Sequence, residues 1–227
     1  MATIKKTVLG RISGAVGDVV FKEKNGKNFV GLRAASFIPG SDSGSIERRA
    51  KFSLSTQLAS VINSNSQLRS LWLEAIPSGA NVYNYLIKAN YNNLQSDNVT
   101  DLVSIVPGYG FIAKKKTVTF SDTSIQVVTE AIGDNQEIDT SVETKVQLAA
   151  VIFLNNAVDD SVKPRNFISM LSPSQALVLN ADLTFALNLS AQGALIISKY
   201  QIHKGFFSLL TLDANDGLVN FSGTFVG

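Results

Sequence analysis

Hydrophobic and polar residues alternate in two short runs near the start of the chain. Val19 and Phe21 stand among polar residues in the first run, Phe29 stands in the second, and Asn25-Gly26 separates the two. Asn-Gly between alternating runs favours a tight turn, because both central residues of such a turn need a positive φ. The pattern predicts an N-terminal β-hairpin. Glycines upstream allow sharp bends or a close backbone approach; they are Gly10, Gly14 and Gly17.

Apolar residues then recur at helical spacing between residues 46 and 94. Ser45 is a candidate N-cap, with Glu47 in the first turn, and a first helix follows. The segment SQLRSLWLEAI predicts a second helix that Pro77 ends, and residues 80–94 predict a third. About three helices are therefore expected after the loop at residues 37–45.

From about residue 100 the chain is dense in Val, Thr, Ile and Phe, interrupted by turn clusters such as GDNQ, AQG and ANDG. Residues 183, 185, 187 and 189 are apolar in strict alternation, as in a half-buried strand. Six to eight short strands of this kind predict an antiparallel β-sandwich. Within this region, RNFISMLSPSQA is expected to form a short helix or a crossover, and ALIISKYQIHKGFFSLLTL is expected to be one of the strand runs.

The predicted fold class is α+β: an N-terminal β-hairpin with about three helices, followed by an Ig-like antiparallel β-sandwich. Residues 1–100 would be a docking or assembly region, and residues 101–227 the sandwich domain.

Composition narrows the class of protein. The chain has 227 residues, of which 45% are hydrophobic and 17% charged, which is typical of a globular protein. The lack of cysteine excludes thiolate metal sites, cysteine nucleophiles and a disulfide scaffold. The N-terminus MATIKKTVLGRISG has no apolar stretch typical of a signal peptide, and VQLAAVIFL is about half as long as a membrane-spanning helix. We expect a soluble protein without a membrane anchor.

Charge is distributed unevenly. Residues 1–100 hold twelve Lys/Arg against six Asp/Glu, a net +6, and residues 101–227 hold eight against twelve, a net −4. This asymmetry favours head-to-tail contact between subunits or contact with nucleic acid, or it is ordinary surface variation. Direct nucleic-acid contact is not favoured, because Asp18, Glu23 and Glu47 are interleaved with the basic residues.

Lys22 and Lys24 share one face of the predicted strand. A cationic face of this kind binds phosphates or acidic protein, or it protects an exposed edge strand from aggregation. The candidate interaction residues are Arg11, Lys22, Lys24, Lys27, Arg33, Arg48 and Arg49.

Motifs for catalysis are weak. GRISGAVG lacks the Gly-Lys-Ser/Thr of a P-loop and the βαβ context of a dinucleotide site. His203 is the single histidine, and no G-x-S-x-G elbow accompanies it. DANDG at 213–217 lacks the alternating oxygen ligands and closing Glu of a calcium loop, so a turn is expected there. Other loop carboxylates are Asp134, Glu137, Asp139, Asp159 and Asp160. We predict a protein that is not an enzyme, with no catalytic, cofactor or metal residues.

The stretch LGRISGAVGDVVFKEKNGKNFVGLRAA, with RRAKFSLSTQLASVI after it, resembles a largely uncharacterised family of Bacteroidota and their phages. Members open with G-x-x-S-G-x-V-G-x-x-V-F, continue with an NGK turn and a returning strand, and end in a β-rich part. The likeness covers about the first third of the chain. The matching positions are Gly10, Ser13, Gly14, Val16, Gly17, Val20, Phe21, Gly26, Lys27, Val30, Arg33, Arg49 and Phe52.

The resemblance implies a virion structural protein of a tailed phage, in the neck, the tail or a capsid-associated ring. Such a protein would be made in the host cytoplasm and assemble as a homo-oligomeric ring with other virion proteins. The alternative is a cellular module whose β-sandwich binds carbohydrate or protein, with Tyr109 and Phe111 as candidate exposed aromatics. A nucleic-acid binder is the third possibility.

Overall fold

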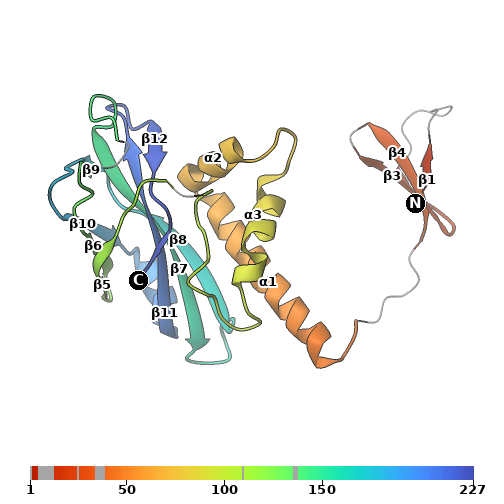
Figure 1. Cartoon of the computed structure of the whole chain (residues 1–227). Coiled ribbons are helices and arrows are strands. Elements are labelled where there is room, and N and C mark those ends of the chain that lie inside the picture. Colours follow the sequence, from red (N-terminus) through yellow and green to blue (C-terminus); the bar gives the residue numbers. More distant parts are fainter. Residues whose placement is uncertain (1, 5–12, 25, 34–38, 109, 135–137) are drawn as a thin grey trace. The chain divides into compact units, whose positions relative to one another are not determined.

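The computed structural model describes residues 2–4, 13–24, 26–33, 39–108, 110–134 and 138–227. The chain divides into two compact units, Met1–Ser45 and Ile46–Gly227. We call the first unit the N-terminal unit and the second the body. The fold is mixed α+β with a β-rich body, as the sequence predicted in outline (Figure 1).

The N-terminal unit is built on one antiparallel sheet in the order β1-β4-β3-β2. Its strands are β1 (Ala2–Ile4), β2 (Gly14–Val16), β3 (Val19–Lys24) and β4 (Lys27–Leu32). Gly17 has a φ of 57° in the turn between β2 and β3, where a left-handed backbone favours glycine. Gly26 has a φ of 72° between β3 and β4, whereas its predicted turn partner Asn25, like Gly10, lies outside the described residues.

The body begins with helices that carry one apolar side each. They are α1 (Ser43–Ser64), α2 (Ser66–Ala75) and α3 (Val82–Asn90), and the short 3-10 helix η1 (Tyr91–Asn93) follows. Asn65 and Asn81 cap α2 and α3 by accepting hydrogen bonds from backbone N–H groups three residues on. The predicted cap of α1 was wrong. The helix starts at Ser43, and Asp42 rather than Ser45 accepts, from the Ser45 N–H at 2.8 Å.

Two antiparallel sheets follow in the body. The smaller has the order β10-β6-β5, and the larger has the order β12-β11-β7-β8, with β13 also on β11 and β9 also on β7. The strands are β5 (Lys115–Phe120), β6 (Ser124–Thr129), β7 (Lys145–Ala157), β8 (Arg165–Leu171), β9 (Gln175–Ala176), β10 (Leu183–Asn188), β11 (Tyr200–Leu212), β12 (Leu218–Phe221) and β13 (Phe225–Val226).

Two local predictions in this region were wrong. Residues 165–171 form strand β8, in register with β7 from Arg165↔Asn155 to Leu171↔Ala149, and not a helix or crossover. Residues 191–197 form helix α4 (Ala191–Ile197), where a turn at residues 191–193 and the start of a strand run at residues 194–197 were expected. The Ser190 hydroxyl starts this helix by accepting from the Gly193 N–H at 3.1 Å.

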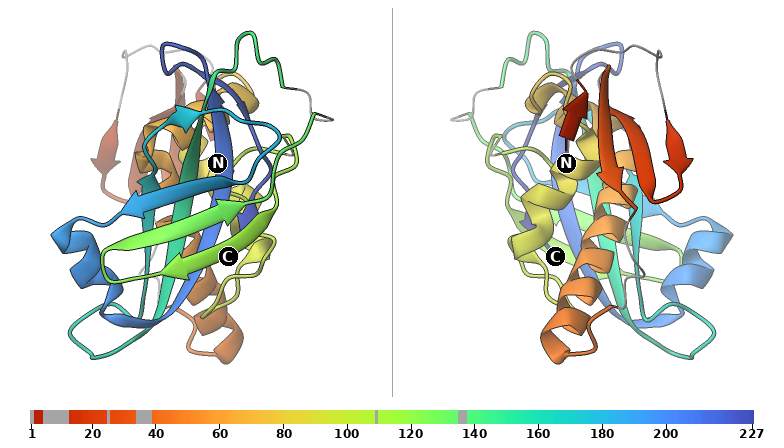
Figure 2. Two further views of the ribbon diagram at one scale, coloured as in Figure 1. Left: turned by 90° about the vertical axis from the view of Figure 1, so that its left-hand side faces the viewer. Right: turned by 90° about the vertical axis from the view of Figure 1, so that its right-hand side faces the viewer.

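The larger sheet is covered on both faces (Figures 1 and 2). On one face Val151 and Phe153 of β7 share a hydrophobic core with helix residues such as Leu58 and Trp72. On the other face Leu148 and Ile152 share a second core with the smaller sheet. The long apolar run of β7 therefore reflects burial on both sides.

Polar contacts tie the helical layer to the sheet. Trp72 Nε1 donates to the Ile105 carbonyl at 2.9 Å, and the Ile105 N–H donates to Thr224 Oγ1 at 3.0 Å. The buried Asn90 side chain donates to the Ser104 carbonyl and accepts from the Ser104 N–H. The helices are thus part of the body, and the division between compact units falls at residue 45 rather than at the expected residue 100.

None of the helices in the described residues is both long and apolar enough to cross a membrane.

Candidate interaction surface

The predicted basic residues are distributed over both units. Lys22 and Lys27 are exposed on β3 and β4, and Arg33 is exposed directly after β4. The Arg33 N–H donates to the Asp18 carbonyl at 2.6 Å, which fixes the end of β4 beside the β2–β3 turn. Arg48 and Arg49 are exposed near the start of α1, which belongs mainly to the body.

Two of the predicted residues are less fully described. Arg11 lies outside the described residues, and only the backbone of Lys24 is described, at the end of β3. The structure therefore brings together a subset of the predicted set on the N-terminal sheet.

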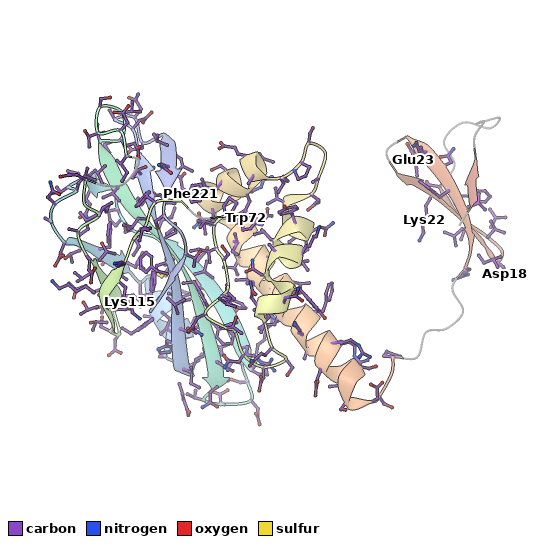
Figure 3. The ribbon with its side chains drawn as sticks, in the orientation of Figure 1. Asp18, Lys22, Glu23, Trp72, Lys115 and Phe221 are labelled. Atoms are coloured by element: carbon purple, nitrogen blue, oxygen red, sulfur yellow. The ribbon has the colours of Figure 1, made fainter. Side chains whose placement is uncertain are left out.

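Strand register defines a lysine face of this sheet, the face that carries Lys22 and Lys27. Lys22 pairs with Phe29 and Lys27 pairs with Lys24, so these positions alternate with those of the opposite face. Lys22 and Glu23 are neighbours on β3 and hence belong to opposite faces (Figure 3). The lysine face is the cationic strand face that the sequence indicated.

The opposite face, which we call the apolar face, consists of Val16, Val19, Phe21, Val30 and Leu32. Val16 pairs with Val19, Val19 pairs with Leu32, and Phe21 pairs with Val30, so the five side chains adjoin across β2, β3 and β4. Val16 is 70% exposed and Leu32 is 83% exposed. Glu23 and Asn28 pair at one end of this face.

Within the described part of the N-terminal unit no hydrophobic side chain is buried. Neither of the two hydrophobic cores includes a residue from this unit. The sheet therefore presents a contiguous apolar surface, which is the kind of feature that marks interaction sites. Sequence reasoning identified the strand pattern but not this surface, because alternation shows where an apolar face lies and not whether anything covers it.

His203 has a structural environment. Its Nε2 lies 2.9 Å from the Tyr200 carbonyl oxygen and 3.2 Å from the Ile197 carbonyl oxygen, so this nitrogen carries the proton and donates. The ring packs beside Phe120, with 5.5 Å between ring centroids. These contacts hold the junction of α4 and β11. A cavity of about 470 Å³ adjoins His203, lined also by Phe120, Asp122 and Leu195.

The loop carboxylates close turns. Asp159 Oδ1 accepts from the backbone N–H and the hydroxyl of Ser161, and these hydrogen bonds lower the pKa of Asp159. The Asp139 carboxylate has the same arrangement with Ser141, and its pKa is lowered for the same reason. Asp213 Oδ1 accepts from Asn215 N and Gly217 N, both at 2.7 Å, so DANDG forms a turn.

Asp134 and Asp160 are each exposed in a turn, and Asp160 directly follows Asp159. Glu137 lies outside the described residues. No group of three or more possible metal-binding His, Cys, Asp or Glu side chains occurs in the chain as described.

The candidate aromatics for carbohydrate binding are not an exposed pair. Phe111 is 6% exposed and belongs to the core between the two sheets, so its prediction as an exposed aromatic was wrong. Its backbone N–H donates to the Phe221 carbonyl at 3.1 Å. Tyr109 lies outside the described residues.

Comparison with known proteins gives no assignment: no family model matches the chain, and no curated protein matches it.

Proposed function

We propose that this protein is a structural component of a tailed-phage virion, in the neck, the tail or a capsid-associated ring, and that it acts by protein–protein assembly. The observation that carries the proposal is the N-terminal sheet, whose apolar face has no buried hydrophobic side chain among the described residues. A β-sheet of this size needs cover on at least one face to be stable in water. The resemblance of the same segment to a family found in phages supports a virion as the setting.

The body supplies a rigid scaffold for such a role. Its larger sheet is buried on both faces, and its two facing sheets support the finer prediction of a sandwich. We retain the Ig-like arrangement as part of the proposal. In an assembly the body would give each copy a fixed shape, and the N-terminal unit would make the contact.

Mass spectrometry of purified phage particles tests this proposal. The chain should co-purify with the particle in a fixed ratio to the other structural proteins, and native mass spectrometry of the isolated chain should give oligomers. A chain absent from purified particles, and monomeric at every concentration, would contradict the proposed function.

The alternative is a cellular module that binds carbohydrate or protein. The burial of Phe111 argues against carbohydrate binding through that side chain. The cavity beside His203 is the observation that favours a ligand-binding module. Titration of the full chain with a glycan library, monitored at the His203 ring by NMR, separates this alternative from assembly.

A further inference from the structure

We propose that the cavity beside His203 binds a guanidinium group carried on an apolar arm, as in an arginine side chain or a free alkylguanidine. The cavity lies in the body, between the β5–β6 turn, helix α4 and the start of strand β11, and has a volume of about 470 Å³. This volume is ordinary for a small-molecule site. The inference goes beyond the proposed function and does not rest on it, because the proposed assembly surface belongs to the N-terminal unit and the cavity belongs to the body.

Contacts between these three elements hold the walls of the cavity in place. The Leu189 N–H, just before α4, donates to the Thr123 carbonyl in the β5–β6 turn at 2.9 Å. His203 of β11 donates through Nε2 to the Ile197 carbonyl at the end of α4, and its ring contacts Phe120 at the end of β5. The cavity is therefore formed before a ligand arrives, and binding requires no ordering of loops.

The polar side chains of the cavity share one property, which is that each can accept a hydrogen bond and none has a proton left to donate. The Ser121 hydroxyl already donates to the Ser124 carbonyl at 2.8 Å. The Ser198 hydroxyl donates to the Leu195 carbonyl at 3.1 Å. The Asp122 carboxylate is an acceptor by its chemistry. The oxygen atoms of all three side chains therefore present lone pairs.

His203 completes this set through its second ring nitrogen. Because Nε2 carries the proton and donates to two carbonyls, Nδ1 of the neutral ring is an acceptor. Nδ1 has no hydrogen-bond partner in the part of the chain that the structure describes, and it is not enclosed. The enclosed side-chain atoms without a partner in that part are Thr129 Oγ1 and Gln147 Oε1. The Nδ1 lone pair is therefore open to a donor in the cavity.

This lining selects a cation that is rich in donors. Among the described residues Asp122 has no ion-pair partner, and no lysine or arginine lines the cavity. An anion would meet a carboxylate there, and a polyol would bring its own lone pairs. A guanidinium has five N–H donors and no acceptor, so it matches a site of acceptors. An ammonium has three donors and is more strongly hydrated, so it should bind less tightly.

The apolar side chains of the cavity suit the rest of such a ligand. Phe120 supplies an aromatic ring, on which a guanidinium stacks. Leu195 and Ile197 of α4 supply aliphatic surface, along which a methylene arm packs. Leu195 is 59% exposed, so the arm would remove apolar surface from water.

His203 gives a direct readout of binding, because it is the single histidine of the chain. The full-length chain with isotope-labelled histidine is titrated with n-butylguanidinium, and the Nδ1 signal is followed by NMR. A hydrogen bond to Nδ1 should move this signal to lower frequency, with a dissociation constant of about 1 mM, as for other small ligands in open sites. The matched control ligand is n-butylurea, which has the same shape but no charge and should bind at least about tenfold more weakly.

A charge-removing variant tests the part played by Asp122. Asp122→Asn keeps the shape of an exposed side chain and should weaken the binding of n-butylguanidinium by about tenfold or more, because a charge-assisted hydrogen bond is lost. Glu74→Gln is the matched control. Glu74 is exposed on α2, in the helical layer on the other face of the larger sheet, and its loss should leave the affinity unchanged.

Two further ligands distinguish the sources of the guanidinium. N-acetyl-arginine-N-methylamide presents arginine as it occurs within a protein, and agmatine presents a free alkylguanidinium. Tighter binding of the first supports the site as a receptor for an arginine of a protein. Tighter binding of agmatine supports it as a site for a free small molecule.

Three outcomes would overturn the inference. Equal affinities for n-butylguanidinium and n-butylurea would remove the role of charge. An Asp122→Asn chain that binds as tightly as the wild type would place the cation elsewhere. A His203 signal that stays unmoved at ligand concentrations far above the expected dissociation constant would show that the cavity takes no guanidinium. The proposed function is judged separately, by the presence of the chain in purified particles.

Discussion

The body and the N-terminal unit use similar strands but differ in what covers them. In the body, strand β7 buries Val151 and Phe153 under helices, and it buries Leu148 and Ile152 under a second sheet. In the N-terminal unit, the apolar side chains of β3 and β4 are half-buried or exposed. Strand pairing alone therefore does not complete a sheet. The body contains its own cover, whereas no hydrophobic side chain of the N-terminal unit is buried among the described residues.

The largest expected difference is between the effects of a Phe→Ala substitution in the body and a Phe→Ala substitution in the N-terminal unit. Phe153→Ala removes a side chain that is 1% exposed and packs against Phe167 at 5.0 Å between ring centroids, so the free energy of unfolding of the body should fall by about 3–5 kcal/mol. Phe21→Ala should leave the unfolding of the body unchanged, because no core residue of the body is in the N-terminal unit.

Trp72 provides the measurement. It is the single tryptophan of the chain and is buried in the helix-facing core, so its fluorescence during urea unfolding reports the body (Figure 3). Equal losses of stability from the two Phe→Ala changes would show that the two units unfold as one.

A second comparison uses glycine. An added Cβ at Gly110 would lie 1.6 Å from the Phe221 carbonyl oxygen, whereas an added Cβ at Gly31 in β4 meets no atom within 4 Å. Gly110→Ala should push the Phe221 end of β12 away from Phe111 and lower the free energy of unfolding of the body by roughly 2 kcal/mol or more. Gly31→Ala should change the stability by less than about 0.5 kcal/mol. Thermal unfolding followed by circular dichroism measures the change in stability of both variants. A Gly110→Ala chain as stable as the wild type would contradict the close approach of Gly110 to the Phe221 carbonyl.

A smaller effect is expected at the helical cover of the body. The Asn81 side chain caps α3 by accepting a hydrogen bond from the Asn84 N–H at 3.3 Å. Asn81→Ala removes this cap and should lower the free energy of unfolding by about 1 kcal/mol. Asn84→Ala, three residues on at an exposed helical position, is the matched control and should be neutral or slightly stabilising. If both variants lose the same stability by urea unfolding, the cap is not the cause.

The smallest effect is expected from surface charge. Asp101 pairs with Lys204 at 2.6 Å, and the hydrogen bond from Lys204 lowers the pKa of Asp101. Asp182 with Lys116 and Asp216 with Lys145 are similar pairs with carboxyl pKa values lowered for the same reason. A carboxyl pKa that is lower in the folded state than in the unfolded state stabilises the folded state at pH values above the ordinary carboxyl pKa of about 3.9. This stabilisation is lost as the pH falls through the lowered pKa.

The body should therefore lose stability on acidification below about pH 4, and Asp101→Asn should make that loss slightly smaller. Urea unfolding midpoints of both chains at a series of acidic pH values give the comparison. An unchanged pH dependence in the Asp101→Asn chain would remove Asp101 from the account.

Much of the fold could be predicted from local pattern. Pro77 follows α2 as expected, and the apolar alternation of Leu183, Phe185 and Leu187 corresponds to the buried side of β10. The assignments that were wrong depend on distant partners. Strand β8 is a strand because β7 pairs with it along seven residues, and its own sequence has no clear alternation. Helix α4 begins at a serine cap inside a run that is otherwise rich in strand-forming residues.

The candidate surface was only partly visible in the sequence. Lys22 and Phe21 are neighbours on one strand and therefore lie on opposite faces of the sheet. This alternation depends only on the local sequence, so the sequence predicted a cationic strand face. Exposure of Leu32 is not local, because it depends on every segment that could fold over it. The burial of Phe111 has the same origin, since Phe221 and the facing sheets surround it from positions far along the chain.

Hydrogen–deuterium exchange of the full chain at two concentrations tests the central claim most directly, that the N-terminal sheet is the surface through which copies of the chain assemble. We predict that the amides of β3 and β4 exchange rapidly at low micromolar concentration and become protected near 1 mM, while those of β7 and β11 are protected equally at both. Exchange of β3 and β4 that does not depend on concentration, whether fast or slow, would contradict the account.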